Sequence, residues 1–218
     1  MRIVCISDTH LSLTDIAVPD GDVLIHAGDL TDEGTADELL GEYSVLSRLP
    51  HRRIIVTPGN HDDALENPQF RRSLEFKFPR ITTLVNEGTI LNGLPIYGSS
   101  WQQRGDEGAI QGQPQSDSSR YSQVPTDISI LVTHGPPYGI QDGTSRGEHV
   151  GSRALRDRLH MLTDLRLHIF GHVHFAYGIT RQDGRLFVNA STCDDVFDPI
   201  NRPIVIDYVH GYFKIARI

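Results

Sequence analysis

The sequence predicts an α/β (α+β) fold in which strands form one mixed sheet, or two packed sheets, flanked by helices. Short apolar runs rich in β-branched residues recur along the chain, and several are continuous, as in strands that are covered on both faces. Helical segments separate these runs in the first half of the chain. Strand-like runs joined by turns such as Gln182-Asp183-Gly184 fill roughly the last fifty residues.

The expected strands share an apolar run bounded by turn-forming residues. They cover residues 2–7, 23–26, 53–57, 81–85, 96–99, 128–133, 166–170, 186–189 and 204–208. Thr35 and Glu38 form a capping box that begins a helix, and this helix must end before Pro50. Ser152 is expected to cap a second helix, whose apolar face consists of Leu155, Leu159 and Leu162.

One segment, residues 102–125, is polar and rich in Gly, Pro and Ser. Two interpretations are open, a disordered insertion or a long loop that covers a site. Trp101, Arg104, Arg120 and Tyr121 favour the loop, because they are side chains that can anchor it. The chain contains no internal repeat and no clear linker, so we expect a single domain over residues 1–218 with this insertion.

Composition excludes several functions for the 218-residue chain. Its net charge of −8 and pI near 5.7 disfavour binding to long nucleic acids. No apolar run approaches the ~20 residues of a membrane helix, and Asp8 interrupts the N-terminal run too early for a signal peptide. We therefore expect a cytoplasmic protein without a membrane partner. Cys5 and Cys193 form no CxxC pattern, which disfavours a disulfide framework and a thiolate metal site.

Five of the expected strands are followed directly by Asp, Asn or His, at the edge where open α/β sheets place their ligand sites. Each residue alone has an ordinary explanation as a turn, a cap or a buried histidine. Together they predict a metal site, because buried carboxylates and imidazoles need compensating charge. The residues concerned are Asp8, His10, Asp29, Asp32, Asn60, His61, Asp62, His134, His172 and His174.

The donor atoms are oxygen and nitrogen without sulfur. Such a set suits two divalent ions, with manganese expected first and iron, zinc or magnesium as alternatives. The Asp29 carboxylate is the natural bridge between them. Two ions roughly 3.5–4 Å apart lower the pKa of a shared water and hold a phosphoryl group during in-line attack.

The order of these residues resembles that of the calcineurin-like metallophosphoesterase superfamily, whose signature is DxH, GDxxD, GNH(D/E), H and GHxH. The blocks match from residue 8 to residue 174, which is most of the chain. Residues 19–29, 133–137 and 187–193 are similar to the branch of metallophosphoesterase-domain-containing proteins. Animal members of that branch carry Gly where this chain has His172, so the resemblance implies a complete two-metal site here.

The resemblance also implies a fold, a ligand set and a reaction. The fold is a four-layer αββα sandwich of two mixed β-sheets flanked by helices. One metal would be held by Asp8, His10, Asp29 and His174, and the other by Asp29, Asn60, His134 and His172. A bridging hydroxide would attack phosphorus, His61 would contact the phosphate or protonate the leaving oxygen, and Asp62 would orient His61. Asn60 is expected to contact substrate as well.

We therefore expect a phosphodiesterase that hydrolyses a small nucleotide, cyclic nucleotides included. A phosphomonoesterase and a non-catalytic nucleotide-binding or scaffold protein are the alternatives, and a dimer is compatible with the sequence. Arg146 and His149 follow the His134 block and are further candidates for substrate contacts. His26 and His168 lie within expected strands and are interpreted as structural.

Overall fold

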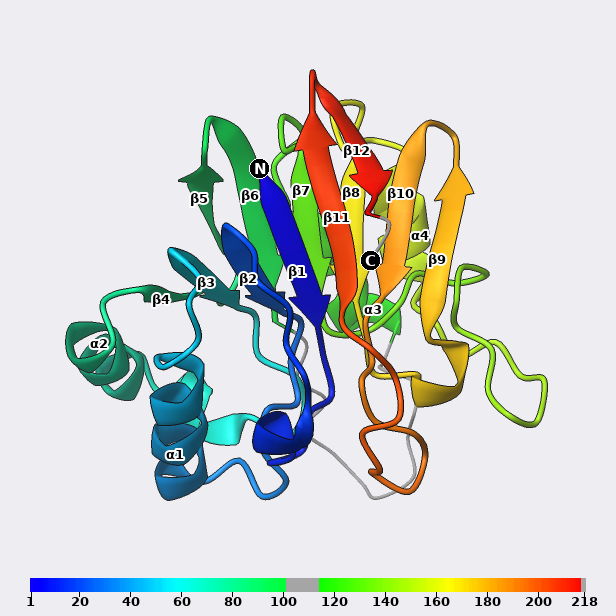
Figure 1. Ribbon diagram of the computed structural model, residues 1–218. Helices are drawn as coiled ribbons and strands as arrows, with labels where there is room; N and C mark the ends of the chain where they lie inside the picture. Colours follow the sequence, from blue (N-terminus) through cyan, green and yellow to red (C-terminus); the bar gives the residue numbers. More distant parts are fainter. Residues whose placement is uncertain (101–113, 217–218) are drawn as a thin grey trace.

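Two six-stranded mixed sheets pack face to face in the computed structural model, which describes residues 1–100 and 114–216 (Figure 1). The first sheet has the order β12-β11-β1-β2-β3-β4. Its strands are β1 (Arg2–Ile6), β2 (Val23–His26), β3 (Arg53–Val56), β4 (Ile81–Thr83), β11 (Ile204–Val209) and β12 (Tyr212–Ile215). Strands β1 to β4 are parallel, whereas β11 and β12 run antiparallel to their neighbours.

The second sheet has the order β5-β6-β7-β8-β10-β9. Its strands are β5 (Glu87–Leu91), β6 (Leu94–Ser99), β7 (Ile130–Thr133), β8 (Leu167–Phe170), β9 (Gly178–Gln182) and β10 (Arg185–Asn189). The four central strands are parallel, and the edge strands β5 and β9 are antiparallel to them. In both sheets the parallel strands carry the loops that form the site.

Alternation along each strand divides the interior into layers. In β1, Ile3 and Cys5 lie in the core between the sheets, while Val4 and Ile6 face the opposite side. There they pack with α1 (Ala36–Leu46) and α2 (Pro68–Lys77). The outer face of the second sheet packs with α3 (Pro114–Tyr121) and α4 (Arg153–Leu159). The architecture is therefore the expected αββα sandwich.

Both expected helix caps are present. The Thr35 hydroxyl accepts a bond from the Glu38 nitrogen at 3.3 Å, and the Glu38 carboxylate accepts from the Thr35 nitrogen at 3.2 Å. Ser152 caps α4 by accepting from the Leu155 nitrogen at 3.2 Å. Helix α4 ends at Leu159, so Leu162 lies beyond it, although Leu162 is buried in the same cluster.

The expectation of a long loop over residues 102–125 is wrong for the second half of this segment. Residues 114–121 form α3, and residues 101–113 lie outside the described part of the chain. The helix is short and polar, so its sequence alone does not indicate it. Tyr121, 2% exposed, packs with Val124 and the side chains of α4, and this tertiary contact stabilises the helix. In the described part of the chain, no helix combines the length and the apolar character that crossing a membrane requires.

Candidate metal centre

The site lies where the parallel strands of the two sheets end. Ile6 pairs with His26 and His26 with Val56, so β1, β2 and β3 end at the same level. Backbone bonds continue the pairing into the loops, since the Asp8 nitrogen donates to the Gly28 carbonyl at 2.8 Å. Strands β7 and β8 of the other sheet bring His134, His172 and His174 to the same end.

Four of the expected ligands have left-handed backbone conformations. The φ angles are 53° at Asp8, 40° at His10, 56° at Asp29 and 68° at His172. Such conformations cost of order 1–3 kcal/mol each for residues other than Gly, and they persist only where the surroundings enforce them. Here the neighbouring loops hold these conformations in place. Both oxygens of the Asp8 carboxylate, for example, accept a hydrogen bond from the His172 backbone nitrogen at 3.0 Å. Four strained positions therefore lie at the functional end of the sheets, and further positive φ angles occur elsewhere in the described chain.

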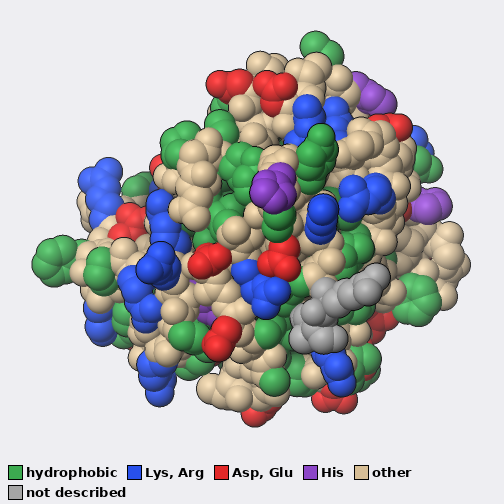
Figure 2. Space-filling view, turned by 45° about the horizontal axis from the view of Figure 1, so that its top comes forward, with side chains coloured by type: hydrophobic (Ala, Val, Ile, Leu, Met, Phe, Trp, Pro, Cys, Tyr) green, Lys and Arg blue, Asp and Glu red, His purple; other side chains and the backbone are tan. Residues whose placement is uncertain are grey.

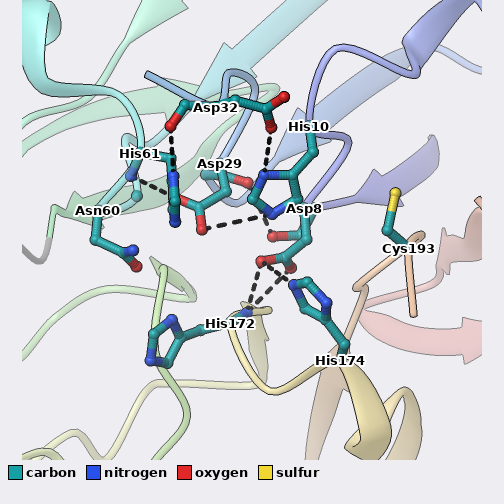
Figure 3. A network of polar contacts seen from close by, with 12 residues as sticks. Asp8, His10, Asp29, Asp32, Asn60, His61, His172, His174 and Cys193 are labelled. Carbon is teal, nitrogen blue, oxygen red and sulfur yellow. Dashed lines mark hydrogen bonds and ion pairs between the residues drawn. The ribbon is translucent and has the colours of Figure 1, made fainter. Parts of the chain in front are cut away.

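Two groups of donor atoms form at this end, each with its atoms within 4.8 Å of one another. The first group contains Asp8, His10 and His174, and its His174 Nε2 lies 3.4 Å from Asp8 Oδ1. Figure 3 shows these side chains pointing toward one another from the ends of β1 and β8. All three residues belong to the predicted ligand set.

The second group contains Asp29, His134 and His172. His134 Nε2 lies 3.1 Å from Asp29 Oδ2 and 3.0 Å from Asn60 Oδ1. Asn60 therefore borders this group, as expected. Asp29 also faces the first group, because its Oδ2 lies 3.8 Å from His10 Nε2. A carboxylate between two clusters of donors is placed as a bridging ligand would be.

Each of three ligand imidazoles is held through its Nδ1 atom. Nδ1 of His10 lies 3.1 Å from Asp32 Oδ1, Nδ1 of His134 lies 2.9 Å from the Ala27 carbonyl, and Nδ1 of His174 lies 2.7 Å from the Asp194 carbonyl. A carbonyl oxygen and the oxygen of an ionised carboxylate can only accept a hydrogen bond. Each Nδ1 therefore carries a hydrogen and donates it. The lone pair of each Nε2 is then free for a metal, which is the usual arrangement around metal-binding histidines.

The charges of the site are mutually dependent. Burial raises the pKa of Asp29, but the positive charge and hydrogen bond of His134 outweigh it and lower that pKa. Burial likewise lowers the pKa of His134, and the negative charge of Asp29 reverses the effect and raises it. The buried Asp29 carboxylate is thus stabilised by a positive charge beside it. A bound metal would take the place of the His134 proton.

The residues fit a pair of divalent ions. His10 Nε2 is buried and has no hydrogen-bond partner among the described residues, although it faces two buried carboxylates. A buried polar atom of this kind is costly unless something else binds it. Cys193 adds no thiolate, since burial raises the pKa of its thiol to about 12. Both Cys193 and Cys5 are free and buried.

Two glycines of the motifs allow the backbone to approach the ligands. A Cβ at Gly59 would collide with the Asp29 carboxylate, and a Cβ at Gly171 would collide with the Asp8 carboxylate. Any side chain at these positions would displace a ligand. The physical reason for Gly in both blocks is therefore space rather than a special φ angle.

His61 and Asp62 lie at the site, but their relationship differs from the expected one. His61 Nδ1 lies 2.6 Å from the Asp32 carbonyl oxygen, so Asp32 orients this ring. The buried Asp62 carboxylate instead accepts the backbone nitrogens of Asp29 and Leu30 at 2.8 and 3.0 Å. Asp62 therefore holds the Asp29 loop in place. The expectation that it orients His61 is corrected, because it lies beneath that loop.

Three residues to which the sequence assigned no role also shape the site, and two of them, Ser191 and Phe197, lie outside the predicted list. Asp32 touches both His10 and His61, and it was visible as the last residue of the GDxxD block. The Ser191 hydroxyl donates to Asp8 Oδ2 at 2.8 Å. Phe197 places its ring 4.4 Å from that of His10, centroid to centroid. No sequence signal indicates Phe197, because its loop is distant in the chain from every block.

The further candidates for substrate contacts and the histidines interpreted as structural lie outside the two donor groups. His149 Nδ1 lies 2.7 Å from Asp142 Oδ1, and Arg146 is exposed in the same loop. The structure brings neither of them into the two donor groups. His26 and His168 are fully buried in β2 and β8, and each bonds a threonine hydroxyl, at 3.0 and 2.9 Å.

Fold and site together define a class, the metal-binding αββα proteins whose ligands follow the strand ends of two packed sheets. More particularly, the chain belongs to the calcineurin-like phosphoesterase family, whose model matches residues 1–176. Human metallophosphoesterase domain-containing protein 1 is 33% identical over 229 residues, which cover 94% of this chain and 70% of the human protein.

Solved structures share the fold at low sequence identity. A Thermus thermophilus protein, TT1561, has a TM-score of 0.65 and 14% identity, with 99% of this chain and 97% of that chain covered. A protein described as a novel archaeal phosphodiesterase has a TM-score of 0.55 and 17% identity, with 98% of each chain covered. These likenesses support the architecture.

Proposed function

We propose that the protein is a two-metal phosphodiesterase that hydrolyses a small nucleotide, cyclic nucleotides included, with manganese as its preferred metal. The observation that carries the proposal is the position of Asp29 between the two donor groups. Its Oδ2 lies 3.8 Å from His10 Nε2 and 3.1 Å from His134 Nε2. When bound, two ions at such a site polarise a phosphoryl group and acidify an attacking water.

The protein's own residues would supply positioning and proton transfer. Asp8 and Asp29 provide the negative charge that holds the cations, and Asn60 adds a neutral oxygen beside His134. The Nδ1–H of His61 donates a hydrogen bond to the Asp32 carbonyl, and in the imidazolium form the ring would give its Nε2 proton to the phosphate or the leaving oxygen. His172 belongs to the second group, and the proposal therefore favours an enzyme over a binding protein that has lost ligands.

The substrate class rests on resemblance and on charge. The motifs resemble the metallophosphoesterase-domain branch, and one protein of the same fold is described as an archaeal phosphodiesterase. The net charge of −8 opposes binding to a long polyanion. On the face shown in Figure 2, the Lys and Arg side chains of the described residues are interspersed with acidic and apolar ones. A small phosphoester fits these features better than DNA or RNA.

The test removes bound metal with a chelator and then restores Mn, Fe, Zn or Mg singly. We expect metal-dependent hydrolysis of bis(p-nitrophenyl) phosphate that is faster than hydrolysis of p-nitrophenyl phosphate. The 2′,3′- and 3′,5′-cyclic nucleotides, compared with nucleoside monophosphates, then define the substrate. Faster monoester hydrolysis would replace the proposal by a phosphomonoesterase, and no metal-dependent turnover of any of these substrates would refute catalysis.

A further inference from the structure

We propose that Phe197 determines substrate specificity, with its ring as the platform on which the nucleobase of the substrate stacks. This inference rests on the proposed function, because it takes the substrate to be a nucleotide. The ring centroid of Phe197 lies 4.4 Å from that of His10 and 5.8 Å from that of His174. A planar group stacked on this ring would therefore lie beside a phosphate held at the first donor group.

The Phe197 side chain is 49% exposed and belongs to none of the three hydrophobic clusters that the described residues form. Its ring lies against the imidazoles of His10 and His174. Folding therefore leaves about half of this large apolar surface in water. An aromatic face that remains open beside a polar site is suited to stack with a planar ligand.

The backbone at Phe197 is held in an unfavourable conformation. Its φ angle is 63°, in the left-handed region, which is uncommon for a bulky residue. Asp194 enforces the turn, because its Oδ1 accepts the nitrogens of Val196 and Asp198 at 3.0 Å and its carbonyl accepts the Phe197 nitrogen at 3.0 Å. Strain that the surroundings over-determine in this way is typical of functional positions.

Both ends of the loop that carries Phe197, residues 194–201, are hydrogen-bonded to the first donor group or to residues that contact it. The Asp194 carbonyl accepts His174 Nδ1 at 2.7 Å. Asn201 Nδ2 donates to the Ser191 carbonyl at 3.1 Å, and the Ser191 hydroxyl bonds Asp8. The loop thus fixes the Phe197 ring relative to the ligands rather than leaving it to swing freely.

Other apolar residues of this loop and of the segment after β8 are also exposed. Val196 and Ile200 of the same loop are 71% and 66% exposed, and Phe175, directly after His174, is 65% exposed. A purine or pyrimidine stacked on Phe197 would cover part of the exposed ring. Stacking of a base on an aromatic side chain changes affinity by about tenfold or more when the side chain is replaced by Ala.

The experiment compares adenosine 5′-monophosphate with ribose 5-phosphate, which carries the same sugar and phosphate but no base. Calorimetric titration of the metal-loaded protein should show the adenine compound bound about tenfold more tightly. Phe197→Ala should bring the two affinities together by weakening only the nucleotide, and Phe197→Trp should keep the preference. Phe76→Ala, which removes a 92% exposed ring on α2, is the matched control and should bind both ligands like the wild type.

Equal loss of both ligands in Phe197→Ala, together with lower metal content by elemental analysis, would overturn the platform and assign Phe197 a purely structural role beside His10. An unchanged preference in that variant would overturn it as well. The two proposals fail differently. A base preference without any metal-dependent hydrolysis contradicts the phosphodiesterase alone, whereas hydrolysis without a base preference contradicts the platform alone.

Discussion

The Asp62 carboxylate accepts the backbone nitrogen of Asp29 at 2.8 Å, and this bond joins the GNHD block to the GDxxD block beneath the metal centre. The same carboxylate accepts the nitrogens of Leu30 at 3.0 Å and Gly59 at 2.9 Å. Asp62 is fully buried, so these backbone groups have no water to replace it. The left-handed conformation of Asp29 depends on this support.

Replacing Asp62 by Ala should therefore destabilise the protein strongly. Each buried N–H left without an acceptor costs about 1–3 kcal/mol, and several are affected at once. We expect the free energy of unfolding to fall by about 3 kcal/mol or more in urea denaturation, with metal content reduced. Asp62→Asn keeps one acceptor oxygen and should lose less. A wild-type unfolding midpoint for Asp62→Ala would show that the loop is held by other contacts.

Replacing Asp29 by Asn should reduce metal content and activity together, because a neutral amide cannot serve both donor groups as a carboxylate does. Elemental analysis after extensive dialysis measures occupancy, and the diester assay measures turnover. Asp183→Asn, in the turn between β9 and β10, is the control and should match the wild type. Full occupancy in Asp29→Asn would exclude a bridging role.

Replacing His61 by Ala should leave the metals bound and slow turnover by about 10²–10⁴-fold, the usual contribution of a positioned acid or base. The ring lies beside the donor groups, 5.1 Å from the His10 ring, and it is held by the Asp32 carbonyl rather than included in either group. Elemental analysis and kcat are measured on the same preparation. A fully active variant would remove His61 from the reaction.

Replacing Gly59 by Ala should weaken metal binding by more than about tenfold, because the added methyl group displaces the Asp29 carboxylate. Gly41→Ala is the matched control. A Cβ there, within α1, meets nothing within 4 Å, and helix propensity predicts a gain of about 1 kcal/mol in stability. Metal titrations and thermal unfolding of both variants separate the local effect from a general one. Equal behaviour of the two variants would contradict the steric explanation.

Stability should depend on pH through Glu42, which is 7% exposed on α1 and whose Oε2 has no hydrogen-bond partner among the described residues. Burial, with smaller contributions from the charges of Asp62 and Asp32, raises its pKa from 4.5 to about 7. The native protein therefore holds this proton more tightly than the unfolded chain does. The resulting stabilisation is fully present below pH 4.5 and is lost as the pH rises through about 7.

Glu42→Gln removes this dependence, so the variant should be more stable than the wild type by about 2 kcal/mol at pH 8. Below about pH 4.5 the two proteins should approach each other. Urea denaturation across this range, with Glu33→Gln as an exposed control, measures the difference. A constant difference between pH 4 and pH 8 would show that Glu42 does not titrate in this way.

The positions of the central strands along the chain, and the blocks of candidate ligands that follow them, could be predicted from the sequence. Runs such as those of β1, β2 and β7 are buried on both faces, so their composition alone indicates strands. The edge strand β4 was expected, but the edge strands β5 and β12 were missed, for the opposite reason. In β5, Gly88 and Ile90 are exposed, and in β12 Tyr212 is 70% exposed, so neither run has a continuous apolar pattern.

Motifs in the sequence also placed the ligands correctly at one end of the sheets, because the carboxyl ends of parallel strands meet there. The hydrogen-bond partners that hold these residues became visible only in the folded structure. Asp32 rather than Asp62 orients His61, and Phe197 lies against His10 although the two are far apart in the chain. Both relationships arise from packing between loops, which depends on three-dimensional position and leaves no periodic signal in the sequence.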